Sequence, residues 1–270
     1  EPEIYSIAGL TSFIELAKEK NSNSYPIHLK IDTGMHRLGF EKEDISELIS
    51  LLEHNNFVKV TSIFSHLAAT DNLDFKDFTL QQIQLFELIS NQIATTLNIQ
   101  PIRHILNTSG IFNYSEYQFE MVRLGIGIYG VGNSEEEQSS LENVSTLKSI
   151  ISQIRTVEPN ESIGYSRKFM VKKEMRVATI PIGYADGIRR AWGNEKGFVL
   201  INNQEATILG NVCMDMLMVD VTNINCNERD EVIIFGENPH VTEIARVCNT
   251  IPYEILTSIS QRVKRIFYKN

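Results

Sequence analysis

The chain has 270 residues, 42% of them apolar, which is enough for one large or two medium domains with cores of their own. Its 34 acidic and 25 basic residues give a formal net charge of -9, which argues against a nucleic-acid partner because such proteins carry a basic surface. No apolar run reaches the roughly 20 residues of a membrane span and no signal peptide opens the sequence, so we expect a cytoplasmic protein without a membrane partner.

The first 135 residues alternate between helical and strand-like patterns. Apolar residues recur every three or four positions in three segments that we predict as helices, 6–20, 41–54 and 74–97. Four shorter apolar runs predict strands, 26–31, 58–66, 102–106 and 119–123. Strands that alternate with helices indicate βα units and a parallel sheet.

A polar stretch over 131–145 contains three consecutive glutamates and predicts a connector between domains. Strand-like runs dominate the remainder: 147–157, 175–181, 198–201, 206–209, 216–221 and 231–235. Only 241–249 has a clear helical pattern there. We therefore predict an α/β domain over 1–135 and a mainly β domain over 136–270.

Three cysteines occur without C-x-x-C spacing, at positions 213, 226 and 248. This number and spacing predict neither a disulfide framework nor a zinc site, and we expect no metal.

The segment VRLGIGIYG spans 122–130 and places three glycines in the G-x-G-x-x-G spacing of dinucleotide-binding turns. Such a turn needs a preceding strand and a following helix whose N-terminus holds the pyrophosphate. Here the last glycine leads directly into the polar connector, so a nicotinamide-dependent dehydrogenase is disfavoured. The glycines instead bring bare backbone amides close to an anion, or form a tight turn that leaves a packed strand.

Ionic and hydroxyl side chains follow each predicted strand of the first domain. They are Lys30 and Asp32 after the first strand, His66 after the second, His104, Asn107, Thr108 and Ser109 around the third, and Arg123 at the fourth. Carboxyl ends of parallel strands meet at one edge, where chemistry collects. Taken alone, His66 can make a structural hydrogen bond, and Thr108 can cap the helix that follows it. Lys30 lies in an apolar strand, and a buried lysine needs a partner or a chemical modification. Together they favour a site for a phosphate-bearing cofactor.

These residues lie within ordered motifs that resemble the pyridoxal-phosphate-dependent alanine racemases. The motifs are LKIDTGMHRLGF, FSHLAATD, HILNTSG, VRLGIGIYG, IGYSRKF, IPIGYADGIRR and LGNVCMDMLMVDV, and they cover essentially the whole chain. The resemblance implies part of a (β/α)8 barrel followed by a β domain, a head-to-tail homodimer with shared active sites, and alanine as substrate. It is similar to the racemases that follow a muramyl-peptide ligase in some Bacteroidetes-type bacteria.

The resemblance also implies roles for residues of the first domain. Arg123 faces the pyridine nitrogen, with His104 hydrogen-bonded to it, and its permanent charge leaves that nitrogen unprotonated. Phosphate contacts fall to Thr108, Asn107 and the amides of Gly125 and Ile126. Arg37 binds the substrate carboxylate, and Lys30 matches a lysine that is often carbamylated and then holds Arg37.

Residues of the second domain complete the implied site across the dimer. Tyr165 moves the proton on one face of the substrate. A tyrosine titrates near pH 10 in water, so cationic neighbours such as His66 and Arg123 are expected to assist it. The loop of Cys213, Met214 and Asp215 lies near the substrate, and Tyr184 belongs to the entryway.

Two departures from the family pattern stand out. The V-x-K-A-x-A-Y-G-H-G motif, whose lysine binds the cofactor covalently, does not occur in these 270 residues, and Gln261 replaces a tyrosine that contacts the phosphate in many members. We therefore expect a C-terminal fragment with the last four barrel strands, inactive on its own and prone to associate through open strand edges.

Two other functions stay open at this point. Racemases for serine or lysine share most of these motifs, so the substrate assignment is weaker than the family assignment. A non-catalytic binding or dimerisation module is the alternative from a different class of protein.

Overall fold

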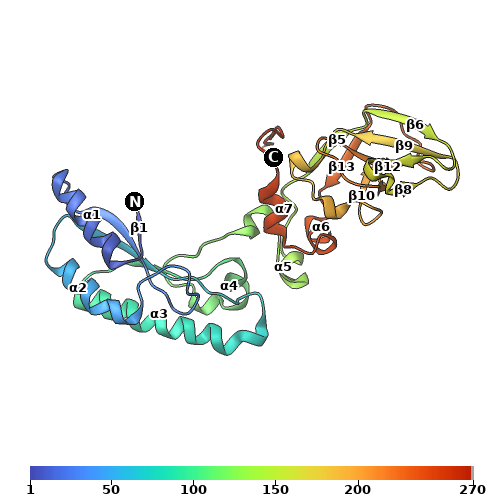
Figure 1. Ribbon diagram of the computed structural model, residues 1–270. Helices are drawn as coiled ribbons and strands as arrows, with labels where there is room; N and C mark the ends of the chain where they lie inside the picture. Colours follow the sequence, from blue (N-terminus) through green and yellow to red (C-terminus); the bar gives the residue numbers. More distant parts are fainter. Residues whose placement is uncertain (269–270) are drawn as a thin grey trace. The chain divides into compact units, whose positions relative to one another are not determined.

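The computed structural model describes residues 1–268, which divide into two compact units (Figure 1). Unit 1 contains Glu1–Ile128 and Gly132–Leu141, and unit 2 contains Tyr129–Val131 and the described residues from Glu142 onward. None of the helices in residues 1–268 is long and apolar enough to cross a membrane.

Unit 1 is built on four parallel strands in the order β1–β2–β3–β4. The strands are β1 (Glu3–Ile4), β2 (Tyr25–Lys30), β3 (Val58–Phe64) and β4 (Ile102–His104). They alternate with α1 (Ile7–Glu19), α2 (Ile45–Glu53) and α3 (Lys76–Thr96), the last two each preceded by one 3-10 turn, η1 (Lys42–Asp44) and η2 (Leu73–Phe75). The alternation agrees with the pattern predicted from the sequence, although the two-residue β1 is too short to have been predicted.

The register of this sheet aligns the ends of three strands. Lys30 pairs with Phe64, and Phe64 pairs with His104, so the last residues of β2, β3 and β4 lie side by side. Polar side chains that follow these strands therefore start from one edge of the sheet.

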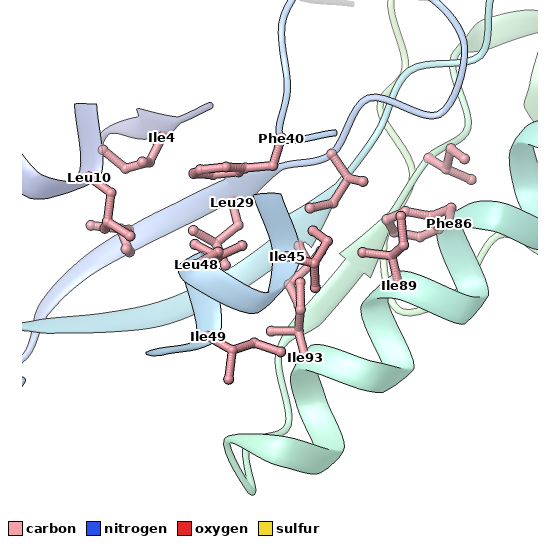
Figure 2. Packing of buried hydrophobic residues seen from close by; sticks show 14 of the residues in the cluster. Ile4, Leu10, Leu29, Phe40, Ile45, Leu48, Ile49, Phe86, Ile89 and Ile93 are labelled. Carbon is pink, nitrogen blue, oxygen red and sulfur yellow. The ribbon is translucent and has the colours of Figure 1, made fainter. Parts of the chain in front are cut away.

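The two faces of the sheet differ in chemistry because successive side chains of a strand point to opposite sides. Ile27, Leu29 and Ile63 are buried on one face, and Figure 2 shows Leu29 packed among side chains of α2 and Phe40. The opposite face carries His28, Lys30 and the side chains level with them on β3 and β4.

A local signal in the sequence fixes the start of α1. The Ser6 hydroxyl caps this helix by accepting a hydrogen bond from the Gly9 amide at 3.2 Å.

Helix α3 buries one face whose members recur every three or four residues: Thr79, Gln82, Ile83, Phe86, Ile89, Ser90 and Ile93. Burial of this face against the sheet holds the strands that carry the polar edge.

The strand predicted over 119–123 does not form. The segment makes one backbone hydrogen bond to β4, from Glu120 to Arg103 at 3.3 Å, and one to the residues that follow β4, from Arg123 to Leu106 at 3.0 Å. The chain leaves β4 again at the glycine turn, where the 3-10 turn η4 (Ile126–Tyr129) replaces the long helix of a dinucleotide-binding motif. The missing helix agrees with the argument against a dinucleotide site.

Part of the predicted polar connector is folded onto unit 1. Residues Glu135–Ser139 form the short helix α5, capped by the Ser134 hydroxyl. Glu137 is only 2% exposed, and its carboxylate accepts hydrogen bonds from the Asn133 amide at 2.8 Å and the Ser109 hydroxyl at 3.2 Å. A run of glutamates predicts a solvated segment, and these local hydrogen bonds are what bury one of them.

Unit 2 contains a seven-stranded antiparallel sheet in the order β5–β13–β10–β11–β12–β9–β6. Its strands are β5 (Leu147–Ile150), β6 (Gln153–Val157), β9 (Met175–Ile180), β10 (Phe198–Ile201), β11 (Gln204–Leu209), β12 (Leu217–Asp220) and β13 (Glu231–Phe235). A small hairpin, β7 (Ser162–Ile163) with β8 (Phe169–Met170), and the helices α6 (Val241–Val247) and α7 (Pro252–Ser258) complete it. The run predicted over 147–157 is two strands, and α7 was not predicted.

We expect Ile89→Ala to lower the free energy of unfolding by about 2–5 kcal/mol, because Ile89 is buried in the α3 face and its truncation leaves a cavity. The adjacent Leu88 is 57% exposed on the same helix, so Leu88→Ala is the matched control and should cost far less. Urea denaturation of both variants measures the difference. Equal costs would show that α3 does not bury this face.

Candidate functional site

Arg123 lies at the edge where the strands of unit 1 end, with its guanidinium among backbone carbonyls and two histidines. One terminal nitrogen donates to the His104 carbonyl at 3.1 Å and to His104 Nδ1 at 2.5 Å. The other donates to the carbonyls of Ser65 at 2.6 Å and Ile105 at 3.3 Å, and contacts His66 Nδ1 at 3.3 Å. The predicted contact between Arg123 and His104 is therefore present in the structure.

Burial and the charge of Arg123 keep the two histidines of this cluster neutral, while Arg123 itself stays charged. Burial lowers the pKa of His66 to about 4, assisted by the positive charge of Arg123, and burial and Arg123 lower the pKa of His104 likewise to about 4. Burial also lowers the pKa of Arg123 to about 10, which leaves it protonated near neutral pH. The expectation that His66 acts as a cation is therefore wrong: both imidazoles are neutral near pH 7, and Arg123 is the charged member.

Phe64 covers one side of the cluster. Its ring stacks on the His104 ring at a centroid distance of 4.9 Å, and the Arg123 guanidinium lies 5.3 Å from its centroid. The Lys30 ammonium lies 5.7 Å from the same ring. An aromatic side chain at the end of β3 thus orients three polar groups from neighbouring strands.

Lys30 has an anionic partner in the structure. Its ammonium lies 2.9 Å from a Glu3 carboxylate oxygen, and the Lys30 side chain is only 10% exposed. Of the two explanations predicted for a buried lysine, a partner or a modification, Glu3 supplies the partner. Carbamylation of Lys30 stays a prediction, as does its link to Arg37.

The glycine turn lies against the hydroxyl of Thr108 at the start of α4 (Thr108–Asn113). Thr108 Oγ1 accepts hydrogen bonds from the amides of Gly125 at 3.0 Å and Gly127 at 3.3 Å. A Cβ at position 127 would lie 2.9 Å from the Thr108 methyl carbon, so glycine is needed for this close approach. Because a hydroxyl has two acceptor sites and one proton, Thr108 still has its proton to donate to an acceptor-only group such as phosphate.

Asn107, not Thr108, caps α4. Its side-chain oxygen accepts hydrogen bonds from the Gly110 amide at 3.0 Å and the Thr70 hydroxyl at 2.7 Å. The cap explanation for Thr108 is therefore wrong, which leaves the Thr108 hydroxyl for the glycine turn.

Arg37 is carried on a loop that Asp32 shapes. One Asp32 carboxylate oxygen accepts the amides of Gly34, Met35 and His36 at 2.9–3.1 Å. Arg37 is exposed, and its positive charge contributes to lowering the pKa of His66. The loop thus brings a cation to the same edge as His66 and Arg123.

In unit 2, Tyr165 projects from a tight turn. The residues before and after it, Gly164 and Ser166, have φ values of 73° and 60°, and Arg167 follows with φ of 50°. The Asn211 side chain donates to the Tyr165 carbonyl at 3.2 Å, and the Tyr165 side chain is 70% exposed. Successive left-handed residues are strained unless their surroundings hold them, which marks this turn as a place where a side chain is presented.

Two neighbouring loops of unit 2 are joined by hydrogen bonds. The Tyr184 amide donates to the Cys213 carbonyl at 3.0 Å, and the Ala185 amide to the Met214 carbonyl at 2.9 Å. Arg262 binds Asp186 on one loop at 2.7 Å and Asp215 on the other at 2.6 Å. Tyr184, Cys213 and Met214 are therefore held together by the backbone of the two loops.

A cavity of about 450 Å³ in unit 2 is lined by Tyr165 and Cys213, together with Ile163, Val177 and Met218. Burial raises the pKa of the Cys213 thiol, so this lining residue is an uncharged thiol. Two of the predicted residues of unit 2, Tyr165 and Cys213, thus line one cavity.

Sequence reasoning missed two polar residues of unit 1 that touch predicted ones, Glu3 and Ser62, and a third, His28, that contacts Ser62. Glu3 binds Lys30, and Ser62 contacts both His28 and His104. The sequence of β2 contained a signal for this polar face. His28 and Lys30 alternate with Ile27 and Leu29, and such alternation puts the polar side chains on one face of the strand.

Comparison with known proteins gives a consistent result for both units. The family model described as alanine racemase, N-terminal domain, matches residues 1–133, and the model described as alanine racemase, C-terminal domain, matches residues 144–267. Alanine racemase 1 of Clostridium acetobutylicum is 34% identical over 280 residues, covering 100% of this chain and 72% of that protein.

Solved structures show the same similarity. The alanine racemase of Clostridium difficile 630 superposes with a TM-score of 0.89 at 34% identity, covering 97% of this chain and 69% of that one. The alanine racemase of Bartonella henselae with covalently bound pyridoxal phosphate has a TM-score of 0.85 at 30% identity, covering 99% of this chain and 73% of that one.

Acid should destabilise unit 1 before its carboxylates titrate. Since the pKa of His66 and His104 falls from 6.5 in the unfolded chain to about 4 in the folded one, the unfolded chain binds more protons below pH 6.5. The free energy of unfolding is therefore expected to fall as the pH decreases from 6.5 to about 5, and to keep falling toward pH 4.

Urea denaturation over this pH range measures the slope. His66→Asn keeps an acceptor near Arg123 and removes one titrating group, so it should flatten the slope, whereas the exposed His54→Asn serves as control. Identical slopes for the two variants would contradict the assignment.

Proposed function

This chain belongs to the alanine racemase family, and we propose which of its residues bind pyridoxal phosphate and which bind alanine. The racemase resemblance, the barrel-type and β-type fold class, the pyridoxal-phosphate dependence and the isomerase activity predicted from the sequence are confirmed by these relatives. The family interconverts L- and D-alanine, and when bound, its cofactor withdraws electrons from the carbon that carries the exchanged hydrogen.

Thr108 and the glycine turn are proposed to hold the phosphate. The support is the arrangement of donors: Thr108 Oγ1 accepts from Gly125 and Gly127 and retains its own proton. The Ile126 amide lies between these two donors in the turn, and we assign it to the phosphate as well. Asn107 supports this region through the α4 cap.

Arg123 is proposed to face the ring nitrogen of the cofactor. The support is its charge, which its surroundings preserve, because its neighbours there are carbonyl oxygens and the nitrogens of two neutral imidazoles. A guanidinium has only donors, so it leaves the ring nitrogen without a proton. This weakens electron withdrawal and disfavours side reactions such as transamination. The single observation that carries the proposal is this guanidinium held by His104 and the strand ends.

Arg37 and Tyr165 are proposed to act on the substrate. Arg37 is an exposed cation beside the His66 edge, which suits a carboxylate. Tyr165, exposed on its turn, moves the proton on one face of the substrate carbon, with Cys213, Met214 and Tyr184 around the entry.

A homodimer is proposed to unite the two sets of residues, with unit 1 of one subunit completed by Tyr165 of a second. The support lies in unit 2, where Tyr165, Met214 and Met216 are large apolar or aromatic side chains that are 70%, 54% and 49% exposed. Large apolar side chains exposed on one loop, as Met214 and Met216 are, are typical of an interaction surface. We further propose a cytoplasmic location and a role in supplying D-alanine for peptidoglycan.

Replacing Thr108 by valine should weaken binding of pyridoxal phosphate about 5–10-fold, because one hydrogen bond to the phosphate and the support of the turn are lost. A titration of this chain with the cofactor, followed by absorbance or fluorescence, measures the dissociation constant. Thr156→Val, at an exposed position of β6, is the control and should bind as the unmodified chain does. An unchanged constant for Thr108→Val would remove Thr108 from the phosphate site.

Tyr165→Phe should lower kcat/KM for alanine racemisation by about 10²–10⁴-fold, the range typical of a lost general acid or base. The assay uses a racemase polypeptide that contains this segment together with the cofactor-binding lysine, since the lysine motif does not occur in these 270 residues. Tyr5→Phe, at an exposed tyrosine of unit 1, is the control. Unchanged rates in both directions would exclude Tyr165 as the proton-transferring group.

A further inference from the structure

A row of polar side chains crosses the sheet of unit 1 on the face opposite the apolar core. Arg123 contacts His104 Nδ1 at 2.5 Å, and His104 Nε2 lies 3.2 Å from Ser62 Oγ. Ser62 Oγ lies 2.7 Å from His28 Nδ1, and His28 Nε2 lies 2.8 Å from a Glu1 carboxylate oxygen. Neighbouring strands thus form one unbroken chain of contacts behind Arg123.

The strand register explains how these residues meet. His28 on β2 is the partner of Ser62 on β3, which places the two side chains next to each other on one face. His104 follows two residues after the β4 partner of Ser62, Ile102, and so points to the same face. The contacts therefore follow from the backbone pairing of β2, β3 and β4.

The donor at one end favours one position for the proton on His104. Arg123 is protonated near neutral pH and its nitrogens only donate, so their contact favours a His104 Nδ1 that accepts and carries no proton. In a neutral imidazole the proton then lies on Nε2, which donates to Ser62 Oγ.

The remaining hydrogen bonds take their direction from the other end. A Glu1 carboxylate only accepts, so His28 Nε2 donates to it, and His28 Nδ1 then faces Ser62 Oγ. Ser62 consequently accepts from His104 and donates its own proton to His28 Nδ1. Every donor in the row has one acceptor.

We propose that Ser62 and His28 are positioning residues that hold His104 in the Nε2–H form with Nδ1 turned toward Arg123. This inference rests on the proposed function only in its consequence, which is the orientation of Arg123 toward the cofactor. The row itself is a property of this chain alone.

Burial makes the direction matter. Ser62 is 1% exposed and His104 is 5% exposed, so water is excluded from the gap between them. If the Ser62 proton had no acceptor at His28, it would turn to His104 Nε2, which would move the imidazole proton to Nδ1. That proton would then face the Arg123 guanidinium, and two donors would oppose each other.

Nitrogen-15 NMR of the chain labelled at histidine tests the assignment, because protonated and unprotonated ring nitrogens have well-separated chemical shifts. His104 is expected to show an unprotonated Nδ1 and a protonated Nε2 near neutral pH. A protonated Nδ1, or an imidazolium, in the unmodified chain would overturn the proposal.

Four variants then separate positioning from packing. Ser62→Ala and His28→Leu should draw the two nitrogen shifts of His104 toward each other, as the proton divides between both sites. His28→Asn retains an acceptor close to the place of Nδ1 and should keep the original shifts. Ser90→Ala, at a buried serine of α3 bonded to its own helix at Glu87, is the control for a lost buried hydroxyl and should leave His104 unaffected.

Unchanged His104 shifts in both Ser62→Ala and His28→Leu would overturn the positioning role, and so would a shift of equal size in Ser90→Ala. Circular dichroism of each variant identifies any that unfolds. Ser62→Ala and His28→Leu are independent tests, so the variant that folds still decides. Binding of pyridoxal phosphate is measured separately, so a chain that binds no cofactor but keeps the His104 pattern would refute the proposed function and not this inference.

Discussion

The buried charge of Arg123 is the constraint on which the rest of unit 1 depends. An uncompensated cation in a protein interior is costly, and here the cost is met by acceptors that the strand ends supply. Carbonyls of Ser65, His104 and Ile105 and the Nδ1 atoms of two histidines surround the guanidinium. The acceptors converge because β3 and β4 end level with each other, so the site follows from the register of the sheet.

The same charge determines the chemistry of its neighbours. With Arg123 protonated, His66 and His104 stay neutral and serve as acceptors, so among these three residues Arg123 alone carries a positive charge. Unit 2 presents the complementary group, an exposed Tyr165 on a turn of left-handed residues. Unit 1 carries the cationic edge proposed for the cofactor and unit 2 carries the tyrosine proposed to transfer the proton, which is the basis for proposing that a second subunit completes the site.

Much of this could be predicted because the motifs lie at strand ends. The alternation of helices and strands and the clustering of His66, His104 and Arg123 follow from the pattern of motifs at strand ends. The charge states of the histidines could not be predicted, since they arise from burial and from an arginine up to 57 residues away in sequence. The Glu3–Lys30 pair and the row through Ser62 could not be predicted either. They depend on the register of parallel strands, which is set by pairing between residues far apart in the sequence. The strand predicted over 119–123 does not form because the segment bonds to β4 through the Glu120 amide and then to Leu106, beyond the end of β4.

A site shared between two subunits is tested most directly by co-expressing two defective racemase subunits that each contain this segment and the cofactor lysine. One carries Arg37→Gln, an exposed position outside the buried Arg123 cluster, and the other carries Tyr165→Phe. If unit 1 of one subunit works with Tyr165 of the other, co-expressed hybrid dimers contain one intact site, and random pairing should restore about a quarter of the unmodified activity. A mixture as inactive as its two parents would contradict a site shared between subunits.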